Sequence, residues 1–320
     1  MTWKPISNGR RSSKTFQRDL ISDRISQKYE MLGKIGTGKF SSVHRAKSRL
    51  SGNLYAIKLI EKSRLLKDEA ELLKNETSIM KVLDHPNCIR LHESFETLEY
   101  LYYVIELVEG QDLYRYVNDR VYLEEIEASQ IMSQIFNAVG YLHSLGIIHR
   151  DLKPENVMLQ LNAKDENKIE NVKLIDFGFS IYYEELKIKK TACGTLNYTA
   201  PEILSGEDYD YKCDCFSLGV ITYYLIKGEL PFHNDTHEIL IKNILEGNYQ
   251  MEGDEFFFNV SPEGKDLITK LLESDPAKRI SITEAQQHPW ITNKDNLRKY
   301  YQKNKQDTFD VGNFVNFNGL

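Results

Sequence analysis

His149-Arg-Asp-Leu-Lys-Pro-Glu-Asn156, followed by Asp176-Phe-Gly178, is the stretch of sequence that decides the fold. It supplies the carboxylates of Asp151 and Asp176, the amide of Asn156 and the ammonium of Lys153. These groups would make a poor hydrophobic core, whereas oxygen ligands beside a lysine suit a divalent metal ion and phosphate. A His-Arg-Asp triplet alone could equally be a capped turn or a surface ion pair. Eight consecutive residues followed by a second acidic motif make that alternative weak.

A glycine-containing segment follows the strand-like segment 29–35, and the chain then continues as a strand at 43–46 and, after a turn at 51–53, at 54–60. The glycine-containing segment is Gly36-Thr-Gly38-Lys-Phe-Ser41-Ser-Val43. Glycine lets the backbone approach phosphate oxygens without a Cβ in the way, and free amides there can donate to the anion. In a dinucleotide-binding fold the glycines would open a helix, but here the chain continues as a strand. The pattern therefore favours a phosphate-binding loop between strands.

Two charges of opposite sign stand on faces that are otherwise apolar. In the strand 54–60, Lys58 points the same way as Ala56. In the helical segment from about 63 to 83, Glu76 falls within the apolar stripe. A buried charge is costly unless it is paired, so we expect Lys58 and Glu76 to form an ion pair. In the alternative reading, Lys58 extends its charge to solvent and Glu76 lies at the edge of the stripe.

Together these motifs resemble the eukaryotic protein Ser/Thr kinase family over about residues 29–290. The chain is most similar to the calcium/calmodulin-dependent protein kinase group, including the kinase domains of calcium-dependent protein kinases, through Lys189-Lys-Thr191-Ala-Cys-Gly-Thr195 and Asn75-Glu76-Thr-Ser-Ile-Met80. The resemblance implies an α+β, bilobal fold with ATP in the cleft. The small lobe, 29–107, would be an antiparallel β-sheet with one helix, and the larger lobe, 113–290, mainly α-helical.

The resemblance also implies transfer of the γ-phosphate of ATP, with Mg²⁺, to Ser or Thr hydroxyls of protein substrates. Asp151 would be the base, Lys58 and Lys153 would contact phosphate, and Asn156 and Asp176 would bind the metal. The ATP-binding residues it implies are Ile35, Gly36, Thr37, Gly38, Lys39, Phe40, Ser41, Ser42, Val43, Ala56, Lys58, Glu76, Ile105, Glu106, Val108, Asp112, Glu155, Met158 and Asp176. Asp112 could instead be an exposed carboxylate of a linker at 108–112.

Regulation is expected in the segment 179–200. Arg150 is a ready partner for a phosphate there, and Thr191 is the expected acceptor for an upstream kinase. By resemblance, Thr195 supports Asp151 and Lys153. The family likeness also predicts that Asp214 holds the backbone of the catalytic loop, residues 149–156, and that Glu202 pairs with Arg279. The chain departs from the family pattern at three places, with Ser41 for a glycine, Leu196-Asn197 for Pro-Gly and Phe216 for Trp.

Composition limits the remaining possibilities. No apolar run is long enough to span a membrane and no signal core begins the chain, so we expect a cytoplasmic protein, with nuclear access open. The net charge is −6, but basic ends at 1–28 and 291–320 leave −13 for the middle. An acidic body disfavours nucleic acid and favours cationic peptides, although a solvated charged face is the default explanation.

The two ends of the chain carry the least information. We expect residues 1–28 to be a flexible basic arm, with order beginning near Tyr29. The tail 291–320 is a candidate calmodulin-binding or pocket-blocking segment, and a docked or disordered structural tail is the competing reading. The polar segment 162–171 lacks the spacing of a calcium loop and is expected to be a solvated hairpin turn. A non-catalytic pseudokinase is the main rival, since it would bind nucleotide or partners without transferring phosphate; a small-molecule kinase is another.

Overall fold

The computed structural model describes residues 23–38, 41–97, 99–162, 164–186, 194–251 and 253–300. Lys39, Phe40 and Thr191, which the sequence points to, lie outside these ranges. The chain forms two compact units. The first comprises the residues up to Leu113 together with Glu155–Ser180, and the second comprises Tyr114–Pro154 and the residues from Ile181 on.

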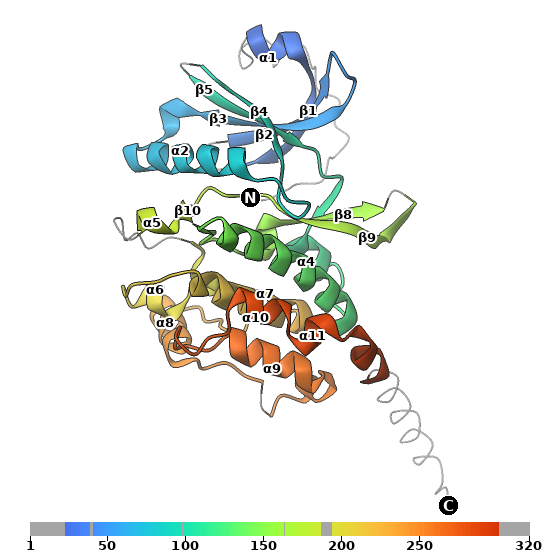
Figure 1. Ribbon diagram of the computed structural model, residues 1–320, viewed down its shortest axis with the longest axis vertical. Helices are drawn as coiled ribbons and strands as arrows, with labels where there is room; N and C mark the ends of the chain where they lie inside the picture. The colour runs from blue at the N-terminus through green and yellow to red at the C-terminus, as the bar shows by residue number, and fades with distance from the viewer. Residues whose placement is uncertain are drawn as a thin grey trace, which may run out of the picture. The chain divides into compact units, whose positions relative to one another are not determined.

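The first unit contains an antiparallel sheet in the strand order β1-β2-β3-β5-β4, with the helix α2 across one face (Figure 1). Its elements are α1 (Asp23–Lys28), β1 (Tyr29–Thr37), β2 (Ser41–Ser48), β3 (Leu54–Glu61), α2 (Lys67–Val82), β4 (Leu91–Glu96) and β5 (Tyr100–Glu106). Helix α2 is tied to the sheet through Thr77, whose hydroxyl lies 2.5 Å from the hydroxyl of Tyr103 on β5. The antiparallel sheet and its one long helix agree with the predicted small lobe.

The central strand β3 separates two environments because alternate side chains point to opposite faces. Ile57 and Leu59 are buried in the apolar cluster on one side of the sheet. Ala56, Lys58 and Ile60 line cavities on the other side. The alternation that predicted the direction of Lys58 is thus the reason that a cation can face a cavity while its neighbours fill a core.

A helix lies within the segment 1–28, where the sequence suggested a flexible arm. Residues 23–28 form α1, and Ile25 on this helix is fully buried in the cluster with Ile57 and Leu59. The backbone amide of Arg49 donates to the carbonyl of Lys28 over 2.8 Å and further fastens the helix. The predicted boundary at Tyr29 was wrong because one buried isoleucine in a polar hexapeptide produces no periodic pattern.

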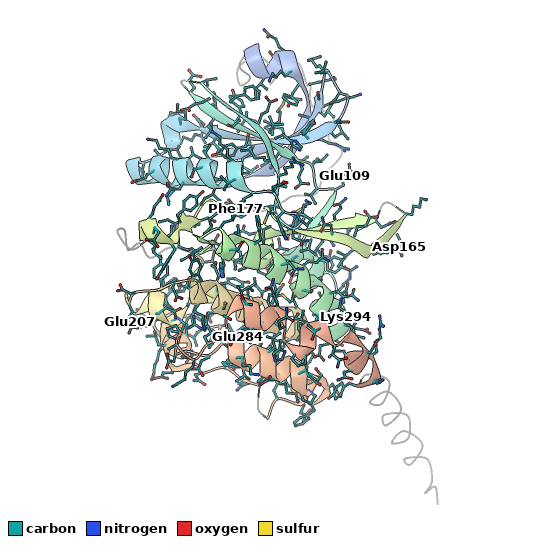
Figure 2. The ribbon with its side chains drawn as sticks, viewed as in Figure 1. Glu109, Asp165, Phe177, Glu207, Glu284 and Lys294 are labelled. Carbon is teal, nitrogen blue, oxygen red and sulfur yellow. The ribbon has the colours of Figure 1, made fainter. Side chains whose placement is uncertain are left out.

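A second, three-stranded sheet in this unit has the order β6-β8-β9. Its strands are β6 (Gly110–Asp112), β8 (Val157–Asn162) and β9 (Asp165–Leu174). The hairpin of β8 and β9 was predicted, but the polar residues expected in its turn belong to β9, and Asp165 lies at the hairpin's outer end (Figure 2). The predicted linker also ends in a strand, where Asp112 is only 3% exposed. The alternative of an exposed linker carboxylate is therefore wrong.

The second unit is mainly helical, as predicted for the larger lobe (Figure 1). Its elements are α3 (Leu113–Asn118), α4 (Glu125–Ser144), β7 (Ile147–Ile148), β10 (Ile181–Tyr182), α5 (Tyr183–Leu186), α6 (Pro201–Leu204), α7 (Lys212–Lys227), α8 (His237–Glu246), α9 (Pro262–Leu271), α10 (Ile282–Gln286) and α11 (Pro289–Thr292). Helix α7 packs against α4 and α9 and is buried on all sides from Cys213 to Ile226. The buried carboxylate of Glu125 joins α4 to α11 by accepting from Trp290 Nε1 over 2.5 Å.

Within the described ranges, no helix is long and apolar enough to cross a membrane. The first part of the predicted tail is packed against the second unit. Leu297 is 1% exposed, and the hydroxyl of Tyr300 donates to the carbonyl of Val260 over 3.2 Å. Residues 301–320, which hold the rest of the proposed calmodulin-binding segment, lie outside the description.

Candidate active site

The first unit contains an apolar pocket of the kind that a flat aromatic base occupies. It is lined by Ile35, Val43, Ala56, Lys58, Ile89, Ile105, Glu106, Leu107, Val108, Met158 and Ile175. Strands β1 to β3 supply one wall and the end of β5 with the residues after it supplies another. The backbone of Glu106 lies at this edge, and its amide donates to the carbonyl of Arg90 over 3.0 Å.

A larger cavity of about 1040 Å³ lies beside the glycine loop in the same unit. Its lining combines loop backbone, a cation and carboxylates. The lining residues are Lys34, Ile35, Gly36, Thr37, Gly38, Ser41, Lys58, Ile60, Leu65, Glu69, Leu72, Leu73, Glu76, Asp176, Gly178 and Phe179. Lys58 lines both this cavity and the apolar pocket, which gives one ligand room to place an apolar end in one and an anionic end in the other.

Lys58, Glu76 and Asp176 form the charged centre of this cavity. Lys58 Nζ lies 2.6 Å from Glu76 Oε1 and 3.6 Å from Asp176 Oδ1. The predicted ion pair is therefore present, and the alternative in which Lys58 reaches solvent is wrong, because its side chain is 11% exposed. Burial acts to lower the pKa of Lys58, but the carboxylates of Asp176 and Glu76 outweigh it and hold the pKa above its usual value. Lys58 is accordingly a permanent cation facing the cavity.

Asn156 and Asp176 provide oxygen donors in the first unit. Their backbones are held close together because the amide of Ile175 donates to the carbonyl of Asn156 over 3.0 Å. Asp176 Oδ1 also accepts from the amide of Gly178 over 3.2 Å, which fixes the carboxylate. One carboxylate and one amide suit a hard divalent cation whose other ligands are phosphate oxygens and water. Among the described residues, no three His, Cys, Asp or Glu side chains are grouped to hold a metal ion.

The second unit holds the predicted base in a closed network of three side chains. Lys153 Nζ donates to Asp151 Oδ2 and to Thr195 Oγ1, each over 2.8 Å. Thr195 Oγ1 donates in turn to Asp151 Oδ1 over 2.8 Å. Both carboxylate oxygens are thus engaged, and the plane of the Asp151 carboxylate is fixed. Thr195 has the position that the family likeness predicted.

The backbone before Asp151 is held from within α7. Asp214 Oδ2 accepts from the amide of His149 and Oδ1 from the amide of Arg150, both over 2.9 Å. His143 Nε2 lies 2.9 Å from Asp214 Oδ2. Burial acts to raise the pKa of Asp214, but the hydrogen bond and charge of His143, with the amide of His149, keep it below its usual value. This fully buried carboxylate therefore stays ionised and can hold two amides at once.

Comparison with known proteins agrees with this geometry. The sequence pattern of the protein kinase domain matches residues 29–291. The chain belongs to the protein kinase family. It is 42% identical over 267 residues to myosin light chain kinase A of Dictyostelium discoideum, covering 83% of this chain and 89% of that protein. It is 39% identical over 271 residues to calcium/calmodulin-dependent protein kinase type 1B of Rattus norvegicus and of Mus musculus, covering 85% of this chain and 77% of each relative.

This kinase is therefore a serine/threonine-protein kinase that transfers the γ-phosphate of ATP to protein substrates. It uses ATP with a divalent metal ion, as its family does. The pseudokinase alternative is not favoured, since the named relatives are kinases and the predicted phosphate, metal and base positions are all filled.

One further ion pair was predicted from the likeness and is present in the second unit. Arg279 makes a two-pronged ion pair with Glu202, at 2.6 Å from Nη1 and 2.8 Å from Nη2, with both side chains buried. Phe216, which replaces a tryptophan of the family pattern, stacks on Phe232 with ring centroids 5.9 Å apart. Although its ring is smaller than that of tryptophan, Phe216 therefore still packs against an aromatic neighbour.

Several residues implied by the likeness line neither cavity. Ser42 lies on β2, Asp112 is buried in β6, and Glu155 lies in the short 3₁₀ helix Pro154–Asn156. The prediction also missed residues that do line the cavities, among them Ile89, Leu107, Ile175 and Leu72. Ile175 and Leu107 could have been found as neighbours of predicted residues. Ile89 gave no signal, because it enters the pocket from the loop between α2 and β4.

Proposed function

We propose that the first unit binds Mg²⁺ and ATP and that the second supplies the base. The adenine would occupy the apolar pocket, with backbone groups at Glu106 and Val108 pairing with it. The amides of the glycine loop and Lys58 would bind the phosphates. Asn156 and Asp176 would hold Mg²⁺, which when bound neutralises charge on the transferred phosphoryl group. Support comes from the cavity that Lys58 shares with Asp176 and the glycine loop.

In the proposed reaction, Asp151 accepts the proton of a substrate Ser or Thr hydroxyl. The hydroxyl oxygen attacks the γ-phosphorus of ATP, the bond from that phosphorus to the β,γ-bridging oxygen breaks, and ADP leaves. The single observation that carries this assignment is the network of Asp151, Lys153 and Thr195. It orients the carboxylate before any substrate arrives, so less reorganisation is required in the transition state. Lys153 is also close enough to Asp151 to contact a phosphoryl group on its way to the hydroxyl.

We propose a preference for basic residues before the target hydroxyl. Glu155 supports this, since its Oε2 has no hydrogen-bond partner among the described residues although it is shielded from solvent. The acidic body of the chain adds a long-range attraction for cationic peptides. Asp112 does not add to this preference, because it is buried in β6.

Calmodulin is a further candidate partner, because the names of two relatives include dependence on calcium and calmodulin. We propose that calmodulin would act through the tail, in which residues after Tyr300 lie outside the described part. The docked position of Leu297 and Tyr300 supports the competing reading, in which 291–300 is a structural tail. Adding calcium and calmodulin to the full chain separates the two, since a structural tail predicts no change in rate.

The test is phosphotransfer from ATP to paired Ser peptides with basic or acidic flanks, with MgCl₂ or with EDTA. The base variant is Asp151→Asn. Its matched control is Asp295→Asn, whose side chain is 79% exposed in the same unit. We expect Asp151→Asn to lose at least a hundredfold in kcat and the control to match wild type. Full activity of a folded Asp151→Asn variant would refute the base assignment. Activity in EDTA would refute the need for a metal ion, and equal use of both peptides would refute the preference for basic residues.

A further inference from the structure

Arg150 has a backbone conformation that an arginine rarely adopts. Its φ is +67°, in the left-handed region, and its side chain is largely buried, with the residue 6% exposed. A residue other than glycine in this region stores strain of roughly 1–3 kcal/mol and persists only where its surroundings hold it. Arg150 directly precedes Asp151, so whatever holds Arg150 also sets the position of the proposed base.

Two of the restraints act on the backbone. The amide of Arg150 donates to Asp214 Oδ1 from one side. On the other side lies Gly194, with φ +107°, where an added Cβ would come within 2.7 Å of the Arg150 carbonyl oxygen. Gly194 is followed by Thr195, which donates to Asp151. The chain around Arg150 is thus enclosed by α7 and by the segment that carries Thr195.

The third restraint acts on the side chain. Arg150 Nη1 donates to the hydroxyl of Tyr209 over 3.1 Å. Tyr209 lies in the turn before α7, and Asp210 fixes that turn by accepting from the amide of Lys212 over 2.8 Å. The acceptor for the guanidinium and the acceptor for the Arg150 amide therefore both belong to the amino-terminal end of α7.

We propose that Tyr209 is a positioning residue for phosphotransfer. Its hydroxyl holds the Arg150 side chain to the end of α7, and the strained backbone of Arg150 transmits that restraint to Asp151. The proposal rests on the assignment of Asp151 as the base. The hydroxyl of Tyr209 holds a residue beside the base in the second unit, whereas the proposed nucleotide site belongs to the first, so its loss lowers kcat and leaves the KM for ATP unchanged.

The experiment compares Tyr209→Phe with Tyr224→Phe. Tyr224 is a matched control in the same unit, because its hydroxyl donates to Asn118 Oδ1 on α3 over 3.0 Å and so holds another element. We expect Tyr209→Phe to lower kcat about three- to tenfold. A loss of this size is expected when one hydrogen bond to a charged group is removed and part of its free energy stabilises the transition state. The KM for ATP stays within twofold, and Tyr224→Phe keeps the wild-type kcat. Thermal unfolding of both variants measures any general loss of stability.

A second comparison tests whether Tyr209 acts through Arg150. In an Arg150→Lys background the geometry of the contact is already lost, so adding Tyr209→Phe changes kcat by less than twofold. Any of three results overturns the proposal. The first is an unchanged kcat for Tyr209→Phe, and the second is an equal loss of kcat in Tyr224→Phe. The third is that Tyr209→Phe lowers kcat as much in the Arg150→Lys background as in wild type. Should Arg150→Lys fail to fold, the comparison of the two tyrosine variants decides alone. If Asp151→Asn retains full activity, the base assignment and the Tyr209 proposal both fall; an unaffected Tyr209→Phe alone leaves the base assignment intact.

Discussion

Removing the negative charge of Glu76 is the perturbation that best separates stability from catalysis in this kinase. Glu76→Gln keeps the shape of the side chain but leaves the Lys58 ammonium without its 2.6 Å partner. Breaking a buried ion pair costs about 3–5 kcal/mol, because an uncompensated charge stays in a site of low polarity. Asp176 remains 3.6 Å from Lys58 and compensates in part. We therefore expect the free energy of unfolding to fall by about 2–3 kcal/mol.

The matched control is an exposed ion pair on the same sheet. Lys62 Nζ lies 2.7 Å from Glu96 Oε1, with side chains 33% and 67% exposed. Pairs of this kind contribute about 0–1 kcal/mol because water screens them. Glu96→Gln should therefore change the unfolding free energy by less than about 1 kcal/mol. Urea unfolding measures both variants under the same conditions.

Replacing both partners by apolar residues gives the opposite combination of effects. In the double variant Lys58→Met with Glu76→Leu, both charges of the buried pair are removed, and such replacements are often neutral or stabilising. Asp176 loses Lys58 as a neighbour, but its side chain is 21% exposed and it still accepts from the amide of Gly178. We expect it to be more stable than Glu76→Gln and yet without measurable phosphotransfer, while Glu76→Gln keeps reduced activity. The reasoning is refuted if Glu76→Gln unfolds like wild type, or if the double variant is less stable than Glu76→Gln.

Three further predictions concern other parts of the molecule. Thr195→Ala should lower kcat about tenfold by freeing one oxygen of Asp151, and Thr195→Ser should restore it; equal rates for all three would contradict the network. Ile25→Ala should lower the unfolding free energy by about 2–4 kcal/mol through loss of a buried contact. Leu50→Ala, at a side chain 99% exposed, should leave it unchanged. Equal urea midpoints for the two variants would contradict a structural role for α1. The pKa of Asp214 in the folded state lies below its unfolded value. The contribution of its carboxylate to folding stability is therefore complete above about pH 4 and is lost as the pH falls further. Asp214→Asn should flatten the dependence of the unfolding free energy on pH below that point, and an unchanged slope would contradict the prediction.

The parts of the site that sequence predicted best are those where a residue type conflicts with its surroundings. Lys58 and Glu76 lie on apolar faces, and burying either charge without a partner of opposite sign would be costly, so the two are expected to pair. The direction of Lys58 followed from strand alternation alone. Contacts such as that of Asp214 with the catalytic loop came from family likeness instead, because nothing in the local pattern around Asp214 indicates which amides it accepts from.

The parts that sequence missed depend on single contacts between distant segments. Ile25 lies in a polar segment, and only the assembled sheet shows that its side chain fills a core. The full length of β9 was not predicted, because polar residues such as Asp165 and Lys168 are exposed there and give no alternating apolar signal. Ile89 enters the base pocket from a loop, and loops carry no periodicity that would show which side chain points inward.

Arg150 and its surroundings show why catalytic geometry is the hardest part to predict from sequence. This residue is held through the amide bound by Asp214, the carbonyl covered by Gly194 and the guanidinium bound by Tyr209. Each contact alone would be worth little, since a hydrogen bond contributes about 1 kcal/mol net. Their joint effect is to hold a strained backbone that no single restraint would secure. The position of Asp151, the neighbouring base, therefore depends on residues up to 64 places away from Arg150 in the sequence. This is why we expect Tyr209, which lies outside the recognised motifs, to affect kcat.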